Sequence, residues 1–423
     1  MKGTFRSLGN RNYRLWAGGA LVSNIGTWMQ RIAQDWIVLT GLTRHNATAV
    51  GMVTALQFGP QLLLLPLTGY AADHLDRRKL LLITQASMGL LALGLGLLTV
   101  SGNVRLWQVY LFAFALGCVT AFDSPARQTF VSELVGEANL SNAVALNSTS
   151  FNAARMIGPA VAGLLIAGVG SGWVFLINAA SFAAVLAALG MLRVTDLHRG
   201  DRAVRSRGSL VDGFRYVRQR PDLIAVLLML LLVGTFGLNF AIYISTMSVT
   251  VFHAGAGTYG LLTSTMAIGS IAGALLAAQR DKPHIPLLLV AAGTFGLGCA
   301  VAAVMPDELL FGTVLVIVGM SAQTFTTSTL SLAQLTTTPA MRGRVIAIVL
   351  AIAMGGTPIG APIVGWVADT FGPRWALGIA ALSGLAAALV ATRYLMRHRD
   401  LRIRLQGGRP QVSLATDRTG APP

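Results

Sequence analysis

Long apolar runs constrain this chain more than any other feature of its sequence. A helix that crosses the hydrocarbon core of a bilayer needs about 20 mainly apolar residues. Only 11% of the 423 residues are charged, against about 25% in a soluble domain. Twelve runs are long enough to cross, at 15–40, 48–72, 80–101, 105–126, 141–169, 172–194, 222–250, 257–279, 284–305, 308–335, 343–369 and 374–396. The sequence predicts an all-α membrane protein with twelve transmembrane helices.

The basic residues predict how these helices are oriented. If the amino terminus is cytoplasmic, 27 of the 32 Lys and Arg residues lie in cytoplasmic segments, two lie inside spans, and only Arg44, Arg105 and Arg374 lie outside the cell. Cytoplasmic segments of membrane proteins carry such an excess. We therefore expect a multi-pass protein of the plasma (inner) membrane with both termini in the cytoplasm. The net charge of +16 does not indicate nucleic acid, because the basic residues alternate with apolar runs and form no single soluble face.

The longest cytoplasmic connection divides the spans into six and six. It predicts an N-terminal six-helix bundle at 1–194, a cytoplasmic linker at 195–221 and a C-terminal six-helix bundle at 222–396. The basic tail at 397–423 is rich in Gly and Pro near its end, and we expect it to be disordered.

The second part of the linker has amphipathic character. It is either an interfacial helix on an anionic inner leaflet or a solvated connection without fixed structure. Its apolar residues are Leu210, Val211, Phe214 and Val217, and its basic residues are Arg215, Arg218 and Arg220.

A weak internal repeat relates the two halves. A shift of 202 residues places Gly158 on Gly360, Gly163 on Gly365 and Trp173 on Trp375, at the same point in the fifth span of each half. Glycines permit close helix approach and tryptophan marks the membrane interface. The repeat predicts two pseudo-symmetric bundles related by an axis along the membrane normal.

The sequence contains no recognisable catalytic or metal-binding motif. None of the three lysines follows a glycine, so there is no Walker A loop for ATP. The six histidines form no H-E-x-x-H pattern or metal cluster with the cysteines, and no G-x-S-x-G elbow occurs. We expect no enzyme activity, no cofactor, no metal and no use of ATP.

The connection between the second and third spans carries a patterned set of residues. Gly69, Asp73, Arg77 and Arg78 resemble the signature loop of the major facilitator superfamily, G-x3-D-x2-G-R-(K/R), with Asp76 where that family usually has glycine. The resemblance implies that the acidic residue pairs with nearby arginines, faces the start of the eleventh helix and latches the inner gate. The alternative is a basic loop that serves only topology.

The fifth span carries a second motif. Gly158, Pro159 and Gly163 resemble the antiporter motif of the same superfamily, G-P-x2-G-G, with Ala162 in place of one glycine. The resemblance implies a gating bend and export by antiport. Alternatively, the Gly-Pro pair is a packing kink.

Three further stretches narrow the resemblance to one branch. The stretches at 122–128, 142–148 and 154–155 are similar to the secretion-effector branch, which includes enterobactin exporters and macrolide or multidrug efflux pumps. The fourth span lacks the arginine that many proton-coupled drug pumps of the superfamily carry near its middle.

Charged residues inside spans are costly and often functional. Arg31 and Asp35 lie four residues apart on one helical face and can form a pair; Asp35 is the candidate proton carrier, or the pair only fixes packing. Arg155 is a candidate cavity residue that either holds an anionic substrate group or pairs with a carbonyl. Asp123 and Arg127 lie near the inner mouth and are gating candidates.

Uncharged polar residues within the spans complete the candidate site. By analogy with the superfamily's central cavity, substrate contacts are expected from spans one, two, seven and ten. The candidates are also compatible with simple helix-to-helix contacts. They are Gln57, Gln61, Asn239, Tyr243 and Gln323.

Together these features predict a secondary active exporter. We expect it to move small amphipathic organic compounds, drugs or siderophores, by alternating access and proton antiport. Its expected partners are the substrate, protons and the lipid bilayer, and it is expected to be a monomer. The alternative is a non-transporting membrane receptor or scaffold with the same fold.

Overall fold

The computed structural model describes most of the chain. The described residues are 5–65, 67–68, 71, 75–198, 210–279, 283–398, 401–406 and 409–414. The signature-loop residues Gly69 and Asp73 lie outside them.

Six long helices form the described part of the first half of the molecule. Asn10, Asn46 and Asp76 cap three of them by accepting a hydrogen bond from the backbone N–H three residues on. Asp76, which replaces a glycine of the family motif, is therefore a helix N-cap. The helices are α1 (Arg11–Trp36), which continues as the π-helix η2 (Ile37–Leu42), α2 (Ala47–Leu63), α4 (Arg77–Val100), α5 (Leu106–Val135), α6 (Glu137–Val169) and α7 (Ser171–Gly190), with short 3-10 turns at Arg6–Gly9 and Val194–Asp196.

The second half begins with a short helix that precedes the membrane. Its seventh crossing is interrupted twice by π-helical turns, η4 (Val233–Gly237) and η5 (Met247–Val251). The other elements are α8 (Leu210–Arg218), α9 (Pro221–Leu232), α10 (Phe240–Thr246), α11 (Ala256–Ala278), α12 (Ile285–Val304), α13 (Glu308–Thr336), α14 (Pro339–Phe371) and α15 (Pro373–His398).

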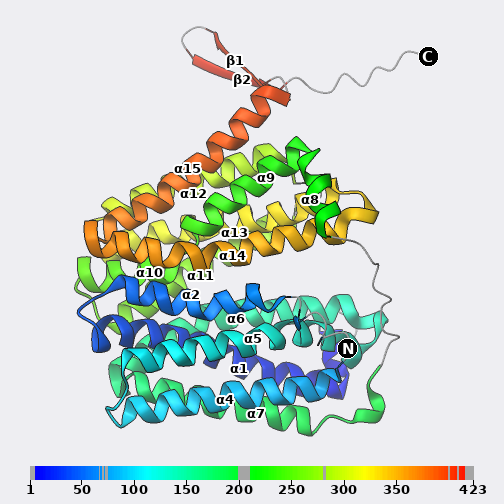
Figure 1. The fold of residues 1–423 in the computed structure, drawn as a ribbon, viewed down its shortest axis with the longest axis vertical. Helices are drawn as coiled ribbons and strands as arrows, with labels where there is room; N and C mark the ends of the chain where they lie inside the picture. Colours follow the sequence, from blue (N-terminus) through cyan, green and yellow to red (C-terminus); the bar gives the residue numbers. More distant parts are fainter. Residues whose placement is uncertain are drawn as a thin grey trace.

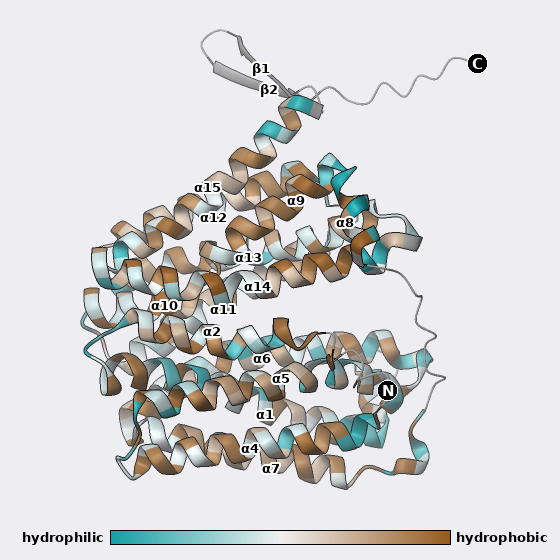
Figure 2. Ribbon diagram, in the orientation of Figure 1, coloured by the Kyte–Doolittle hydropathy of each residue, from teal (hydrophilic) through white to brown (hydrophobic). Residues whose placement is uncertain are grey.

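The helices match the predicted twelve spans. Ten stretches among the described residues are long and apolar enough to cross a membrane. The other two are α1, which contains Arg31 and Asp35, and α2, which is described over 17 residues. Apolar residues dominate most helices, and hydrophilic residues gather near α8 and the loops at the opposite end (Figure 2). The prediction of an all-α, twelve-helix membrane fold is confirmed.

Each half packs mainly within itself, and two seams join the halves. Figure 1 places α1 and α4–α7 in the lower part of the molecule and α8, α9 and α12–α15 in the upper part, with α2, α10 and α11 between them. The seams are α2 against α14 and α6 against α11. We call the end at which α1 begins and α8 lies the inner end, following the predicted orientation, and the opposite end the outer end.

Glycines permit the close approach of the halves at both seams. A Cβ atom at Gly163 of α6 would lie 2.6 Å from the carbonyl oxygen of Ala256, and one at Gly365 of α14 would lie 2.5 Å from that of Ala47. Gly163 and Gly365 are the pair that the 202-residue repeat aligns. The repeat thus places the same small residue at the same point of both seams, near the outer end.

The tail differs in part from the expected disorder. Strands β1 (Leu401–Gln406) and β2 (Arg409–Leu414) pair antiparallel, with Leu401 opposite Leu414. Leu401, Ile403 and Leu405 alternate with polar residues, a period that favours a strand. The prediction of a disordered tail was based on its Gly and Pro content, which does not reflect this alternation.

We predict that Gly163→Ala weakens the α6–α11 seam, because its Cβ would overlap a backbone oxygen and force the helices apart. Overpacking of this kind costs about 1–3 kcal/mol of folding free energy, which thermal unfolding of the purified protein measures as a lower midpoint. Gly168→Ala is the matched control on the same helix, since nothing lies within 4 Å of its Cβ position. Equal midpoints for the two variants would contradict the close-packing interpretation.

Candidate functional site

Two adjoining cavities occupy the middle of the molecule. The larger, about 710 Å³, is lined by α1, α2 and α4–α7 of the first half. The smaller, about 230 Å³, lies between the halves and is lined by α1, α2, α6, α10, α11 and α14 and by residues 238–239. Arg31 and Gln57 line both cavities, so the two volumes meet at these side chains.

The cavities differ in the end that they approach. The larger extends to Gln128 and Val131 near the inner end of α5 and to Val144 near the inner end of α6. The smaller reaches Asp35 and Tyr259, toward the outer end, where the two glycine seams close the gap between the halves. The arrangement therefore extends toward the inner end and is closed at the outer end.

Two arginines meet on one indole ring. The guanidinium carbon of Arg31 lies 4.8 Å from the ring centroid of Trp28 and 5.3 Å from that of Phe58, and that of Arg155 lies 5.7 Å from Trp28. Such cation–π contacts partly compensate a charge that is removed from water. Neither guanidinium makes a hydrogen bond or ion pair with any residue that the structure describes. Their N–H donors are available to a ligand in the smaller cavity.

Asp35 is held by the second half of the molecule. Only 8% of this residue is exposed, and its Oδ2 accepts a hydrogen bond of 3.1 Å from the Tyr259 hydroxyl of α11. Tyr259 also stacks on Trp36, with ring centroids 6.2 Å apart. In the described part of the chain, Arg31 and Asp35 form no ion pair within 4.0 Å, although they share a helical face as expected. A bond between the halves, and not the expected intrahelical pair, fixes this carboxylate.

Asp123 and Arg127 form a network on the wall of the larger cavity. Asp123 accepts hydrogen bonds from Thr84 at 2.7 Å and Gln85 at 2.6 Å and pairs with Arg127 at 3.1 Å. Arg127 also donates to Asn24 at 3.2 Å. These bonds join α5 to α4 and α1 within one half, so they stabilise that bundle and give its inner cavity wall a fixed polar surface.

The two described arginines of the signature loop have partners in the first half. Arg77 forms an ion pair of 2.6 Å with Glu133 of α5, and Arg78 donates two hydrogen bonds, of 2.9 and 2.8 Å, to the carbonyl of Leu189 at the end of α7. A cation at a helix C-terminus is favourable. Glu133 was not among the expected residues. Its one sequence signal was an acidic side chain beyond the expected end of the fourth span at 126, in a connection that also carries Arg127.

Three of the five uncharged candidates line the cavities. Gln57 donates to Gln34 at 3.1 Å, and Gln61 donates to the carbonyl of Gln57 at 3.3 Å. Asn239 donates to the carbonyl of Thr235 at 2.7 Å, while its buried Oδ1 has no hydrogen-bond partner among the described residues. That oxygen is an acceptor at the edge of the smaller cavity.

The other two candidates line neither of these cavities. Tyr243 is buried, and its hydroxyl donates to the carbonyl of Phe236. Gln323 donates to Thr327 on its own helix at 3.1 Å. The π-helical turn η4 precedes Tyr243, so this crossing is not a regular α-helix throughout.

A carboxylate that the sequence did not single out joins the halves at the outer end. Asp369 of α14 accepts hydrogen bonds from the backbone N–H groups of Ala47 at 2.6 Å and Thr48 at 2.8 Å, and from the Thr48 hydroxyl. A negative charge at a helix N-terminus is stabilised by the unpaired N–H groups and the helix dipole. We call this contact between Asp369 and the N-terminus of α2 the outer latch.

Comparison with known proteins places these features in context. The sequence model described as transmembrane secretion effector matches residues 2–418. The chain is 25% identical to a staphyloferrin A transporter of Staphylococcus aureus over 92% of this chain and 97% of the relative, and 27% identical to the multidrug efflux pump Tap of Mycolicibacterium fortuitum over 90% and 95%. It is 26% identical to the enterobactin exporter EntS of Shigella flexneri over 87% of each chain.

Solved structures of transporters share the fold. A bacterial homologue of the human lysosomal transporter Spinster, in an inward-facing and unoccupied conformation, superposes with a TM-score of 0.72 at 13% identity, covering 94% of this chain and 98% of that one. A D-xylose–proton symporter gives a TM-score of 0.70 at 14% identity, covering 92% and 98%. At these identities the likeness concerns the fold alone.

We predict that Asp369→Asn opens the outer end more often, because an amide forms weaker hydrogen bonds to the N–H groups of α2 than a carboxylate does. A loss of about 1 kcal/mol corresponds to an increase of about fivefold in the open population. The measurement is the labelling rate of Thr263→Cys, in the smaller cavity, by a membrane-impermeant thiol reagent from the outer side, with Cys118 and Cys299 replaced by Ser.

The control for this prediction is Asp307→Asn, which changes a carboxylate that caps α13 within its own half. It should leave the labelling rate unchanged. If Thr263→Cys is labelled no faster in the Asp369→Asn variant than in the Asp307→Asn variant, the outer latch does not hold the outer end closed.

Proposed function

This chain belongs to the transmembrane secretion effector family, and we propose that it exports small amphipathic organic compounds by alternating access. The family and its relatives are multi-pass membrane transporters of the major facilitator superfamily and not enzymes, and the same holds for this chain. Curated relatives that match most of its length include siderophore and multidrug exporters, which supports efflux as the direction of transport.

One observation carries the proposal: the site between the halves lies behind a closed outer end and joins a cavity that approaches the inner end. If the two halves rock about this site, the outer seams part and the inner end closes. The same residues then face the opposite side of the membrane. The closed state of the outer end depends on short-range contacts at α2–α14 and α6–α11, which a rigid-body rotation breaks together.

The lining of the smaller cavity suits a particular kind of compound. Trp28 and Phe58 offer aromatic surface, Arg31 and Arg155 offer hydrogen-bond donors, and Asp35 offers an acceptor. An amphipathic molecule with oxygen acceptors for the arginines and a hydroxyl donor for the carboxylate matches all three. Both siderophore and drug substrates remain within this proposal.

We further propose that protons drive export through Asp35. A substrate donor group and a proton both bind the carboxylate oxygens, so each displaces the other, as antiport requires. Tyr259 belongs to α11 of the second half, so opening of the outer end withdraws its hydroxyl and exposes Asp35 to outside water. There the carboxylate takes up a proton and releases the substrate donor. We also propose a monomer in the inner membrane with cytoplasmic termini.

Asp35→Asn is expected to abolish gradient-driven uptake into inverted vesicles, because asparagine cannot carry a proton. A panel of lipophilic dyes, antibiotics and catecholate siderophores is tested with and without an imposed proton gradient. The gradient should stimulate uptake at least tenfold in the parent protein and not at all in the variant, while downhill exchange of substrate continues.

Glu308→Gln is the control, since it removes a carboxylate in the first turn of α13 that lines neither cavity. Retained gradient stimulation in Asp35→Asn would remove Asp35 from the coupling mechanism. No transport of any compound by folded parent protein, with either a proton or a sodium gradient, would favour a non-transporting role.

A further inference from the structure

The linker helix α8 has two different faces. Gly213 and Val217 are buried against the second half, whereas Val211 and Phe214 are 63% and 60% exposed. Arg215 and Arg218 are exposed beside them. We call Val211, Phe214, Arg215 and Arg218 the α8 surface. It combines exposed apolar area with two positive charges. A helix face buried in a protein core does not need the charges, and a solvated face does not need the large apolar side chains.

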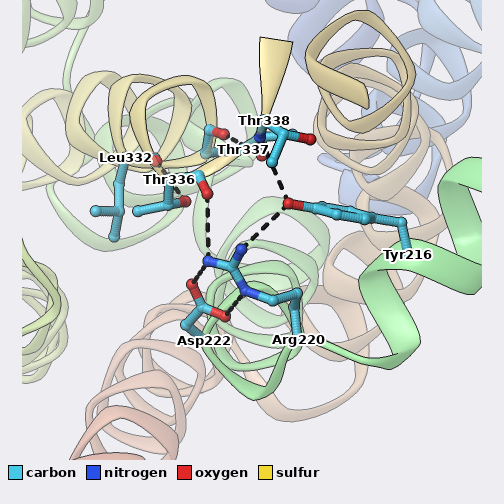
Figure 3. Close-up of polar contacts among 8 residues, drawn as sticks. Tyr216, Arg220, Asp222, Leu332, Thr336, Thr337 and Thr338 are labelled. Carbon is cyan, nitrogen blue, oxygen red and sulfur yellow. Dashed lines mark hydrogen bonds and ion pairs between the residues drawn. The ribbon is translucent and has the colours of Figure 1, made fainter. Parts of the chain in front are cut away.

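A hydrogen-bond network fixes the end of α8 to the second half (Figure 3). Arg220 donates two hydrogen bonds to the carboxylate of Asp222, at 2.9 and 2.6 Å, one to the hydroxyl of Tyr216 at 3.1 Å and one to the carbonyl of Thr336 at 3.2 Å. The Tyr216 hydroxyl in turn accepts from the N–H of Thr338 at 3.4 Å. The network ties α8 to the start of α9, the end of α13 and the segment that leads into α14.

The other side of α8 rests on α14. A Cβ at Gly213 would lie 3.0 Å from Cβ of Arg344, so the backbone of α8 approaches α14 closely. Asp212 forms an ion pair of 3.8 Å with Arg344. These contacts and the Arg220 network hold α8 in one orientation, and the α8 surface therefore points away from the protein.

The position of α8 along the chain places it at the membrane boundary. Only Gln219 and Arg220 separate it from α9, whose exposed residues Ile224, Leu228 and Leu231 lie on one helical stripe. Large apolar side chains exposed on a membrane-spanning helix contact lipid. The lipid-contacting stripe of α9 thus begins six residues after Arg218, the last residue of the α8 surface.

We propose that the α8 surface docks on the anionic phospholipids of the adjoining leaflet. Phe214 and Val211 enter the boundary between headgroups and acyl chains, and Arg215 and Arg218 bind phosphate groups, as in interfacial amphipathic helices. Because α8 is fixed to α14, this docking anchors the inner end of a seam helix to the membrane.

The test uses the full-length protein with Phe214→Trp in lipid nanodiscs, with the wild-type spectrum subtracted. Lipids brominated in their acyl chains quench a nearby indole. We expect quenching of the introduced indole by brominated phosphatidylglycerol to exceed that by brominated phosphatidylcholine severalfold at equal mole fraction, and the difference to shrink at high salt.

Charge variants distinguish binding of anionic lipid by the arginines from simple closeness of the indole to the bilayer. Each arginine near an anionic surface contributes about a fivefold preference, so adding Arg215→Gln and Arg218→Gln should remove most of the preference for phosphatidylglycerol. Arg193→Gln, at an exposed arginine of the first half, is the matched control and should leave it unchanged. Equal quenching by both lipids, or no quenching by either, would overturn the proposal. The readout needs no transport and does not depend on the proposed function.

Discussion

Close backbone contact at the two outer seams is the interaction on which the arrangement of the halves depends. A bilayer exerts no hydrophobic force that presses two apolar bundles together, so helices associate through packing and polar contacts. Here glycines bring α6 to α11 and α14 to α2, and Asp369 adds a polar contact at the start of α2. The smaller cavity lies between the halves on the inner side of these contacts, and the larger cavity, lined by the first half alone, adjoins it toward the inner end.

The charged residues of the site are stabilised by contacts that leave some of their hydrogen-bonding atoms available to a ligand. A charge in the hydrocarbon region is costly unless it is paired or hydrated. Asp35 is compensated by a hydroxyl of the opposite half, and Arg31 and Arg155 by the face of Trp28. Neither kind of contact occupies all the hydrogen-bonding atoms of these side chains. By contrast, Asp123 and Arg127 satisfy each other within one bundle, which suits a structural role in the cavity wall.

Hydropathy and charge predict the helices well, because the bilayer imposes both patterns directly on the sequence. They fail where polar residues continue a helix beyond the membrane: α5 was expected to end at 126 but runs to Val135. The pairs Arg77–Glu133 and Asp369–Ala47 join residues 56 and 322 positions apart, which no local pattern connects. Tyr243 was assigned to the cavity as a polar residue of the seventh span, by analogy with the superfamily, but its side chain is buried and bonds within its own crossing. The π-helical turns of that crossing leave no signal in the hydropathy of the sequence.

The outer seams also bear on how such a protein chooses among substrates. Separating them costs free energy, since the Asp35–Tyr259 bond, the Asp369 contacts and the glycine packing are lost together. A bound compound offsets that cost only to the extent that it interacts better with the separated arrangement than with the closed one. Under the proposed alternating access, two compounds of equal affinity for the closed arrangement are therefore expected to be carried at different maximal rates. We expect the proposed mechanism to express selectivity in turnover more than in Kd.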